Sequence, residues 1–205
     1  MIPQFDLKKE YALLENEIQG KLNEVFSKTN FIGGDNVQSI EENIANYIGV
    51  KYAISCNSGT DALHFALKSF GIGKGDEVIT TPRTFIATAS TIALLKAKPI
   101  FADVDINSGC ITAKNIEPLI TKRTRAISVV HLGGWPADMQ SICELAKAYD
   151  LKVIEDCSQA HGARILINGD WRSVGTFGDV SNFSFYFGHH MTTIEGGMIC
   201  TNDDN

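Results

Sequence analysis

The sequence predicts an α/β fold, with three α/β/α layers built around a mostly parallel sheet. Short apolar runs alternate with longer amphipathic segments, which is typical of strands joined through helices. Small and polar residues follow several of the apolar runs, at the strand ends where such sheets bind ligands. With 205 residues and 44% hydrophobic content, the chain is long enough to bury one domain core.

The expected elements follow in order along the chain. Asp6 to Ser27 has apolar residues at three- and four-residue spacing, and Val37 to Tyr47 is a second helical pattern that ends at Gly49. The expected strands are Tyr52–Cys56, Glu77–Thr80, Pro99–Ala102, Ala126–Val130 and Lys152–Glu155. The helical segments between them are Gly59 to Phe70, Thr84 to Leu95, Lys114–Ile120 and Met139–Tyr149.

Composition and charge exclude several classes of function. A net charge of −6 gives no reason to expect a nucleic-acid or anionic-membrane partner. No apolar run approaches the roughly 18 residues that a membrane span needs, and the N-terminus does not resemble a secretory signal. The five cysteines are scattered and form no CxxC pair, so we expect reduced thiols in a cytoplasmic protein.

The segment after the first expected strand, Ser58-Gly59-Thr60-Asp61, opens a helix. Its small residues free backbone N–H groups, and the helix dipole favours an anion, so it is a candidate phosphate cup. The alternative is a simple N-cap formed by Ser58 or Thr60.

Asp156 ends an apolar strand, and its carboxylate is suited to pair with a protonated ring nitrogen. Its neighbour Glu155 must point to the other side of the strand. A helix-capping or salt-bridged aspartate is the alternative. Gln159 is a candidate contact to a ring hydroxyl or a phosphate, with a surface amide as its alternative. Phe85 is a candidate stacking ring, and alone it is better explained as a core aromatic.

His189 and His190 are adjacent, so in an extended segment their rings point apart and make a poor shared metal site. Either one is a candidate general base because the reference pKa of histidine is near 6.5. We expect structural roles for His64, His131 and His161, and no metal site.

Several segments, in this order, resemble the DegT/DnrJ/StrS family of sugar aminotransferases that depend on pyridoxal phosphate. The resemblance runs from Phe31 to Asp203 and is carried by an ordered set of motifs. These are Asn57-Ser58-Gly59-Thr60-Asp61-Ala62-Leu63, Gly75-Asp76-Glu77-Val78-Ile79, Pro99-Ile100-Phe101-Ala102-Asp103-Val104-Asp105, His131-Leu132-Gly133-Gly134-Trp135-Pro136-Ala137-Asp138-Met139 and Ile154-Glu155-Asp156-Cys157-Ser158-Gln159-Ala160-His161-Gly162.

The resemblance implies an enzyme with the large domain of the aspartate aminotransferase-type fold and with pyridoxal or pyridoxamine 5′-phosphate as cofactor. It implies that Gly59, Thr60, Asp61 and Ser184 hold the phosphate, Phe85 stacks on the ring, Asp156 pairs with the ring nitrogen and Gln159 contacts the ring oxygen or phosphate. The implied partners are a nucleotide-linked 4-keto sugar and an amino donor such as glutamate. Family members are about twice this length and dimeric. We therefore expect residues 1–205 to be an N-terminal portion without the C-terminal small domain, taken from a homodimer.

The chain departs from the family where the cofactor-binding lysine normally stands. His189 occupies that position, and His190 leads into Glu195-Gly196-Gly197, which resembles the subgroup of nucleotide-sugar 3-dehydratases acting on 4-keto-6-deoxyhexoses. An imidazole cannot form the covalent link that a lysine amine forms, so the cofactor would be held by non-covalent contacts. His189 would then act as the general base, and loss of the C3 hydroxyl would give a 3-deoxy sugar. An artificial Lys→His inactivation is a rival explanation.

Two other classes of function stay open. The first is an aminotransferase that uses another amine, although neither Lys122 nor Lys152 lies at an expected strand end. The second is a catalytically inactive relative that keeps the fold. The cysteine spacing fits no iron–sulfur cluster, so a cluster-free enzyme of deoxysugar synthesis, for surface polysaccharides such as lipopolysaccharide or for antibiotics, is the expectation.

Overall fold

The computed structural model describes residues 6–205, and these divide into two compact units, residues 6–40 and 41–205. The first unit contains α1 (Leu7–Lys28), which Asp6 caps by accepting the backbone N–H of Lys9. Helix α2 (Asp35–Ile48) spans the boundary and continues into the second unit. Both helices match the helical patterns in the sequence to within two residues at each end, as is normal for helix boundaries.

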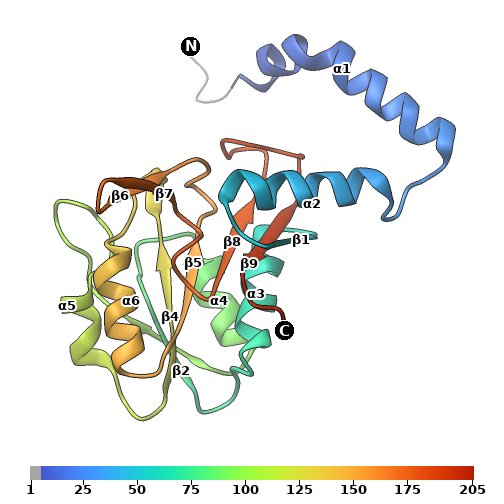
Figure 1. Cartoon of the computed structure of the whole chain (residues 1–205). Helices are drawn as coiled ribbons and strands as arrows, with labels where there is room; N and C mark the ends of the chain where they lie inside the picture. Colours follow the sequence, from blue (N-terminus) through green and yellow to red (C-terminus); the bar gives the residue numbers. More distant parts are fainter. Residues whose placement is uncertain (1–5) are drawn as a thin grey trace. The chain divides into compact units, whose positions relative to one another are not determined.

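The second unit is built on a seven-stranded sheet with the order β1-β9-β8-β5-β4-β2-β3 (Figure 1). The five strands from β3 to β8 are mutually parallel, whereas β9 pairs antiparallel with both β1 and β8. The strands are β1 (Tyr52–Cys56), β2 (Glu77–Thr80), β3 (Lys98–Phe101), β4 (Thr124–Val130), β5 (Lys152–Asp156), β8 (Val180–Ser184) and β9 (Gly197–Thr201). The predicted mostly parallel sheet is confirmed.

Helices cover both faces of this sheet (Figure 1). Successive residues of each strand face opposite sides, so each strand contributes apolar side chains to a core on either face. Val78 and Ala126 pack in a core with α3 (Gly59–Ser69) and α4 (Ala87–Leu94), whereas their neighbours Ile79 and Ile127 pack in a core with α5 (Ala113–Ile116) and α6 (Met139–Ala148). The predicted three-layer arrangement is therefore confirmed, with one apolar core on each side of the sheet.

Two helices are shorter than the sequence predicted. Helix α4 begins at Ala87 rather than Thr84, because residues 82–84 form a bend after strand β2. Helix α5 ends at Ile116 and passes into the 3₁₀ turn Glu117–Leu119, where Pro118 lacks the N–H that a continuing α-helix requires.

A two-stranded hairpin was missed in the sequence. Strands β6 (Arg164–Ile167) and β7 (Asp170–Ser173) are joined at Asn168-Gly169, where both residues have positive φ angles of 53° and 92°. An Asn-Gly pair between short apolar runs is a strong sequence signal for a two-residue hairpin turn, so this element was predictable.

Glu155 and His131 form a buried polar network on the face of the sheet opposite Asp156. The Glu155 carboxylate accepts backbone N–H groups from Gly175, Phe177 and Gly178 and lies 3.1 Å from His131 Nε2. His131 Nδ1 accepts the N–H of Ala137, so Nε2 carries the ring proton and donates it to Glu155. The predicted structural role of His131 is confirmed.

A third potential metal ligand, Cys157, lies beside this pair, with the ligand atoms of all three residues within 4.8 Å of one another. The hydrogen bonds already use both ring nitrogens of His131 and both carboxylate oxygens of Glu155. Burial also raises the pKa of the Cys157 thiol well above its ordinary value, which opposes the thiolate that a metal needs. The cluster is therefore a structural network.

Replacing Glu155 by Gln is expected to lower the free energy of unfolding by about 3–5 kcal/mol. In either orientation of the new amide, its N–H₂ group would face backbone N–H groups, so a hydrogen bond would be replaced by a contact between two donors. Burial alone raises the pKa of Glu155, but the bonds from His131, Gly178 and Gly175 outweigh it and hold that pKa below its ordinary value. The stabilisation is thus present at neutral pH and is lost as the pH falls through the folded-state pKa.

Urea unfolding of the Glu155→Gln protein beside an exposed Glu144→Gln control measures this effect. A difference below about 1 kcal/mol between the two variants would contradict the role given to Glu155.

Two expectations from composition can be compared with the structure. No helix within residues 6–205 is both long enough and apolar enough to cross a bilayer. All five cysteines are free thiols.

Candidate active site

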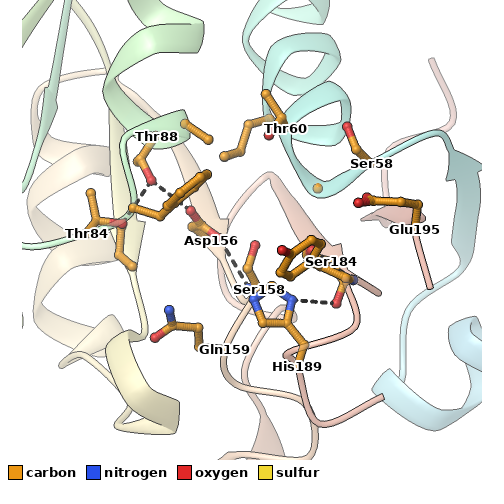
Figure 2. Close-up of a pocket in the computed structure, with 16 residues that line it drawn as sticks. Ser58, Thr60, Thr84, Thr88, Asp156, Ser158, Gln159, Ser184, His189 and Glu195 are labelled. Carbon is orange, nitrogen blue, oxygen red and sulfur yellow. Dashed lines mark hydrogen bonds between the residues drawn. The ribbon is translucent and has the colours of Figure 1, made fainter. Parts of the chain in front are cut away.

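A cavity of about 390 Å³ opens where β4 and β5 end and α3 begins (Figure 2). It is lined by Ser58, Gly59, Thr60, Leu63, Thr84, Phe85, Ala87, Thr88, Val130, Asp156, Ser158, Gln159, Ser184, Tyr186, His189 and Glu195. Seven of the eight residues predicted for the site are in this set, and Asp61 is the exception. The structure therefore brings together predicted residues that lie up to 130 positions apart in the sequence, from Gly59 to His189.

Asp156 is buried in the wall of the cavity and accepts hydrogen bonds from three donors. Thr88 Oγ1 lies 3.0 Å from one carboxylate oxygen, while Asn182 Nδ2 at 3.1 Å and the Ser158 backbone N–H at 3.2 Å reach the other. No Lys, Arg or His of residues 6–205 forms a salt bridge with Asp156, which is evidence against the structural ion-pair alternative. An oriented, buried anion of this kind suits a cationic ring nitrogen.

Phe85 directly follows the bend of residues 82–84 and precedes α4, and 68% of its surface is exposed. The alternative of a core aromatic is therefore wrong. An exposed ring on the wall of a cavity has a free face for stacking on a planar ligand.

The start of α3 combines the two roles that the sequence left open. Ser58 is the N-cap, because its hydroxyl accepts the backbone N–H of Asp61 at 3.1 Å. Gly59 and Thr60 line the cavity with Ser184, and a Cβ on Gly59 would lie only 2.5 Å from the Ser184 Cβ. The glycine thus lets the N-terminus of α3 and its free N–H groups approach Ser184, which makes a cradle for an anion.

Gln159 is half-buried and held in one orientation. Its side-chain Oε1 accepts the backbone N–H of Gly133 at 2.8 Å. Because the carbonyl end is occupied in this way, the amide N–H₂ is left as a donor at the cavity wall. The alternative of a free surface amide is wrong.

His189 lines the cavity from the segment after β8, with its ring toward the side of Asp156 and Ser158 (Figure 2). Its Nδ1 lies 3.2 Å from the backbone carbonyl oxygen of Ser184. A carbonyl only accepts hydrogen bonds, so this contact places the ring proton on Nδ1 and leaves Nε2 with a free lone pair. A neutral His189 in this tautomer is equipped to act as a base through Nε2.

His189 and His190 do not lie in an extended segment, the condition under which their rings would point apart, because the chain turns at Phe187-Gly188. Both rings instead lie near His161, with centroid separations of 6.4 and 6.2 Å. Burial, together with the neighbouring imidazoles of His189 and His190, lowers the pKa of His161 to about 4, so His161 is neutral at physiological pH.

Lys152 and Lys122, the two lysines considered as substitutes, lie away from the cavity. Lys152 begins β5, at the opposite end from Asp156, and its Nζ lies 2.8 Å from Asp179 Oδ1. Lys122 lies in the turn before β4. Lysine is absent from the cavity lining among residues 6–205.

Several polar residues of the site were not predicted. These are Thr84, Thr88, Ser158, Asn182 and Glu195. Thr84 lies on the bend of residues 82–84 and Thr88 in the first turn of α4, so their contact depends on a bend that stands where a helix was expected. Asn182 reaches Asp156 from a neighbouring strand, and this contact depends on the order of strands in the sheet.

The arrangement fits pyridoxal phosphate. The cradle formed by Gly59, Thr60 and Ser184 suits a phosphate, and Asp156 suits the ring nitrogen. The exposed face of Phe85 suits a flat ring, and Gln159 offers a donor to its oxygen.

Comparison with known proteins agrees with the fold. The model of the DegT/DnrJ/EryC1/StrS aminotransferase family matches residues 12–205. The pleiotropic regulatory protein of Geobacillus stearothermophilus is 44% identical over 204 residues, 99% of this chain and 54% of that protein. The UDP-N-acetyl-3-dehydro-alpha-D-glucosamine 3-aminotransferase of Acidithiobacillus ferrooxidans is 44% identical over 203 residues, 98% of this chain and 54% of that protein.

Among solved structures, NtdA from Bacillus subtilis with bound cofactor PMP superposes with a TM-score of 0.85 at 33% identity, covering 92% of this chain and 42% of that one. The chain thus spans about half the length of the curated relatives it matches. The predicted aminotransferase-type fold and the predicted family are both confirmed. On the strength of its ordered motifs, its fold and the match over residues 12–205, this chain belongs to the DegT/DnrJ/EryC1/StrS aminotransferase family.

Proposed function

We propose that the protein containing this chain is a pyridoxal-phosphate or pyridoxamine-phosphate enzyme of nucleotide-sugar biosynthesis. The observation that carries the proposal is Asp156, a buried carboxylate that three donors orient at the cavity and that no cationic side chain of residues 6–205 neutralises. When bound, the cofactor supplies an electron sink, which its ring provides while its nitrogen stays protonated.

The roles proposed for the other residues follow from their positions. Gly59, Thr60 and Ser184 bind the phosphate, Phe85 stacks on the ring, and Gln159 donates to the ring oxygen. Asp61 lies outside the cavity lining and its backbone N–H is bound to Ser58, so we assign it no contact with the phosphate. His189 takes up a proton on Nε2 while Ser184 holds its Nδ1–H.

The first candidate reaction is transfer of an amino group to the keto group of a nucleotide-linked sugar, with an amino donor such as glutamate. Support comes from the relatives, since the Acidithiobacillus protein is named as a nucleotide-sugar aminotransferase. The names of the relatives therefore favour the aminotransferase alternative over the 3-dehydratase that the sequence analysis put first.

One observation favours 3-dehydration as a second candidate. The family's lysine position holds His189, and the cavity lining within residues 6–205 offers no other amine. Without that amine the cofactor stays non-covalently bound in both reactions. The two candidates differ in where the proton held by His189 goes: its return to the sugar carbon gives an amine, whereas protonation of the departing C3 hydroxyl gives a 3-deoxy sugar.

We further propose that the protein works in the cytoplasm as a homodimer, and that residues outside this chain supply a small C-terminal domain. The relatives' greater length supports the additional domain.

Incubation with pyridoxamine phosphate, ¹⁵N-glutamate and a panel of 4-keto-6-deoxy sugars on GDP, dTDP, UDP and CDP tests the reaction. A ¹⁵N-labelled amino sugar supports transamination, and a 3-deoxy sugar with released ammonia supports dehydration. A catalytically inactive protein would give neither product. Failure to bind the cofactor would overturn the proposal altogether.

A further inference from the structure

Two threonine hydroxyls form a directed chain that ends on Asp156. Thr84 Oγ1 and Thr88 Oγ1 are 3.0 Å apart, and Thr88 Oγ1 is 3.0 Å from the Asp156 carboxylate (Figure 2). A threonine hydroxyl has a single proton, and Thr88 uses its proton on the ionised carboxylate. Thr84 must therefore donate to Thr88, so both bonds point toward Asp156.

Thr88 is fixed by its surroundings. It lies in the first turn of α4 and is 1% exposed, whereas Thr84 on the preceding bend is half-buried. Asn182 approaches Asp156 from β8 and also donates to Ser158 Oγ at 3.1 Å. The carboxylate is thus held by donors from α4 and β8 as well as from its own turn, which fixes its plane.

We propose that Thr88 is a positioning residue for the cofactor: with Thr84 behind it, its hydroxyl holds the Asp156 carboxylate in place and aimed at the ring nitrogen. The inference rests on the proposed cofactor. Removal of this donor leaves one carboxylate oxygen free to turn away from the ring nitrogen, so the charge pair that keeps the ring nitrogen protonated weakens. The bound ring then loses part of its cationic character, and the attraction between the two groups weakens.

The test compares Thr88→Val, Thr88→Ser and Thr91→Val in the full protein. Valine keeps the shape of threonine and removes the hydroxyl. Thr91 lies one turn further along α4, is also fully buried, and bonds only to backbone carbonyls, 2.9 Å from that of Ala87. Thr91→Val therefore removes the same group from the same helix without touching Asp156.

The measurements are the dissociation constant of pyridoxamine phosphate and the absorption spectrum of the bound cofactor at neutral pH. Thr88→Val is expected to weaken binding about tenfold and to shift the spectrum toward the neutral-ring form. Thr88→Ser should restore both properties, and Thr91→Val should change neither. Thr84→Val, whose half-buried site tolerates the change, should shift both properties in the same direction by a smaller amount.

Unchanged affinity and spectrum in Thr88→Val, or equal changes in Thr91→Val, would overturn the role of Thr88 while leaving the proposed function intact. If Thr88→Val does not fold, an unchanged spectrum in Thr84→Val overturns it instead. If the unmodified protein binds no pyridoxamine phosphate, the proposed function and this inference fail together.

Discussion

Replacing Asp156 by Asn is expected to weaken binding of pyridoxal or pyridoxamine phosphate by about two to three orders of magnitude. The amide has nearly the same shape but carries no charge to pair with a protonated ring nitrogen. It also turns an N–H₂ group toward Thr88 or toward Asn182 and the Ser158 N–H, all of which donate to the carboxylate in the native protein. Activity should fall at least as far as affinity, because the ring loses its role as an electron sink.

Titration of the cofactor by absorbance or fluorescence measures this loss directly. Asp138→Asn is the matched control, because Asp138 is an exposed N-cap of α6 and asparagine caps helices about as well as aspartate. A dissociation constant for Asp156→Asn within about threefold of the control would show that this carboxylate is not the partner of the ring nitrogen.

Replacing His189 by Asn is expected to lower the turnover number about 10²- to 10⁴-fold, the usual contribution of a positioned base. Cofactor affinity should change far less, because the proposed phosphate and ring contacts come from other residues. The asparagine keeps a polar group near the Ser184 carbonyl but offers no nitrogen that titrates near neutral pH.

His190→Asn is the control for that variant. His190 adjoins His189 and is exposed, and the cavity lining does not include it. Steady-state kinetics with the substrate found active should show near-normal turnover for His190→Asn. Equal losses in both variants would point to a general effect on this turn, and normal turnover in His189→Asn would remove His189 from the reaction.

Much of the fold was predictable because strands and helices alternate with clear periodicity. Tyr52–Cys56 and Glu77–Thr80 were predicted with the bounds that the structure gives to β1 and β2. The Asn168-Gly169 hairpin carried a signal that was overlooked. No sequence signal indicated that β9 lies antiparallel between β1 and β8, because strand order depends on contacts between distant segments.

The candidate site likewise contains some residues that could be identified from the sequence and others that could not. Residues with a distinctive chemistry at a strand end, such as Asp156, could be identified from sequence. Thr88 and Asn182 could not, since a threonine in a helix and an asparagine in a strand are ordinary until the sheet brings both to one carboxylate. The exposure of Phe85 also required the structure, because the bend that turns its ring outward lies where a helix was expected.

The absence of a reactive amine from the cavity lining is the central claim, and borohydride reduction of the holoprotein followed by peptide mass mapping tests it most directly. We predict that the cofactor of the unmodified protein dissociates completely on denaturation and leaves no adduct on any peptide. His189→Lys, reduced in parallel with pyridoxal phosphate, should carry the adduct on the peptide that contains position 189. This positive control would show that the method detects a covalent bond between the cofactor and a lysine. A cofactor-modified lysine in the unmodified protein would contradict the account.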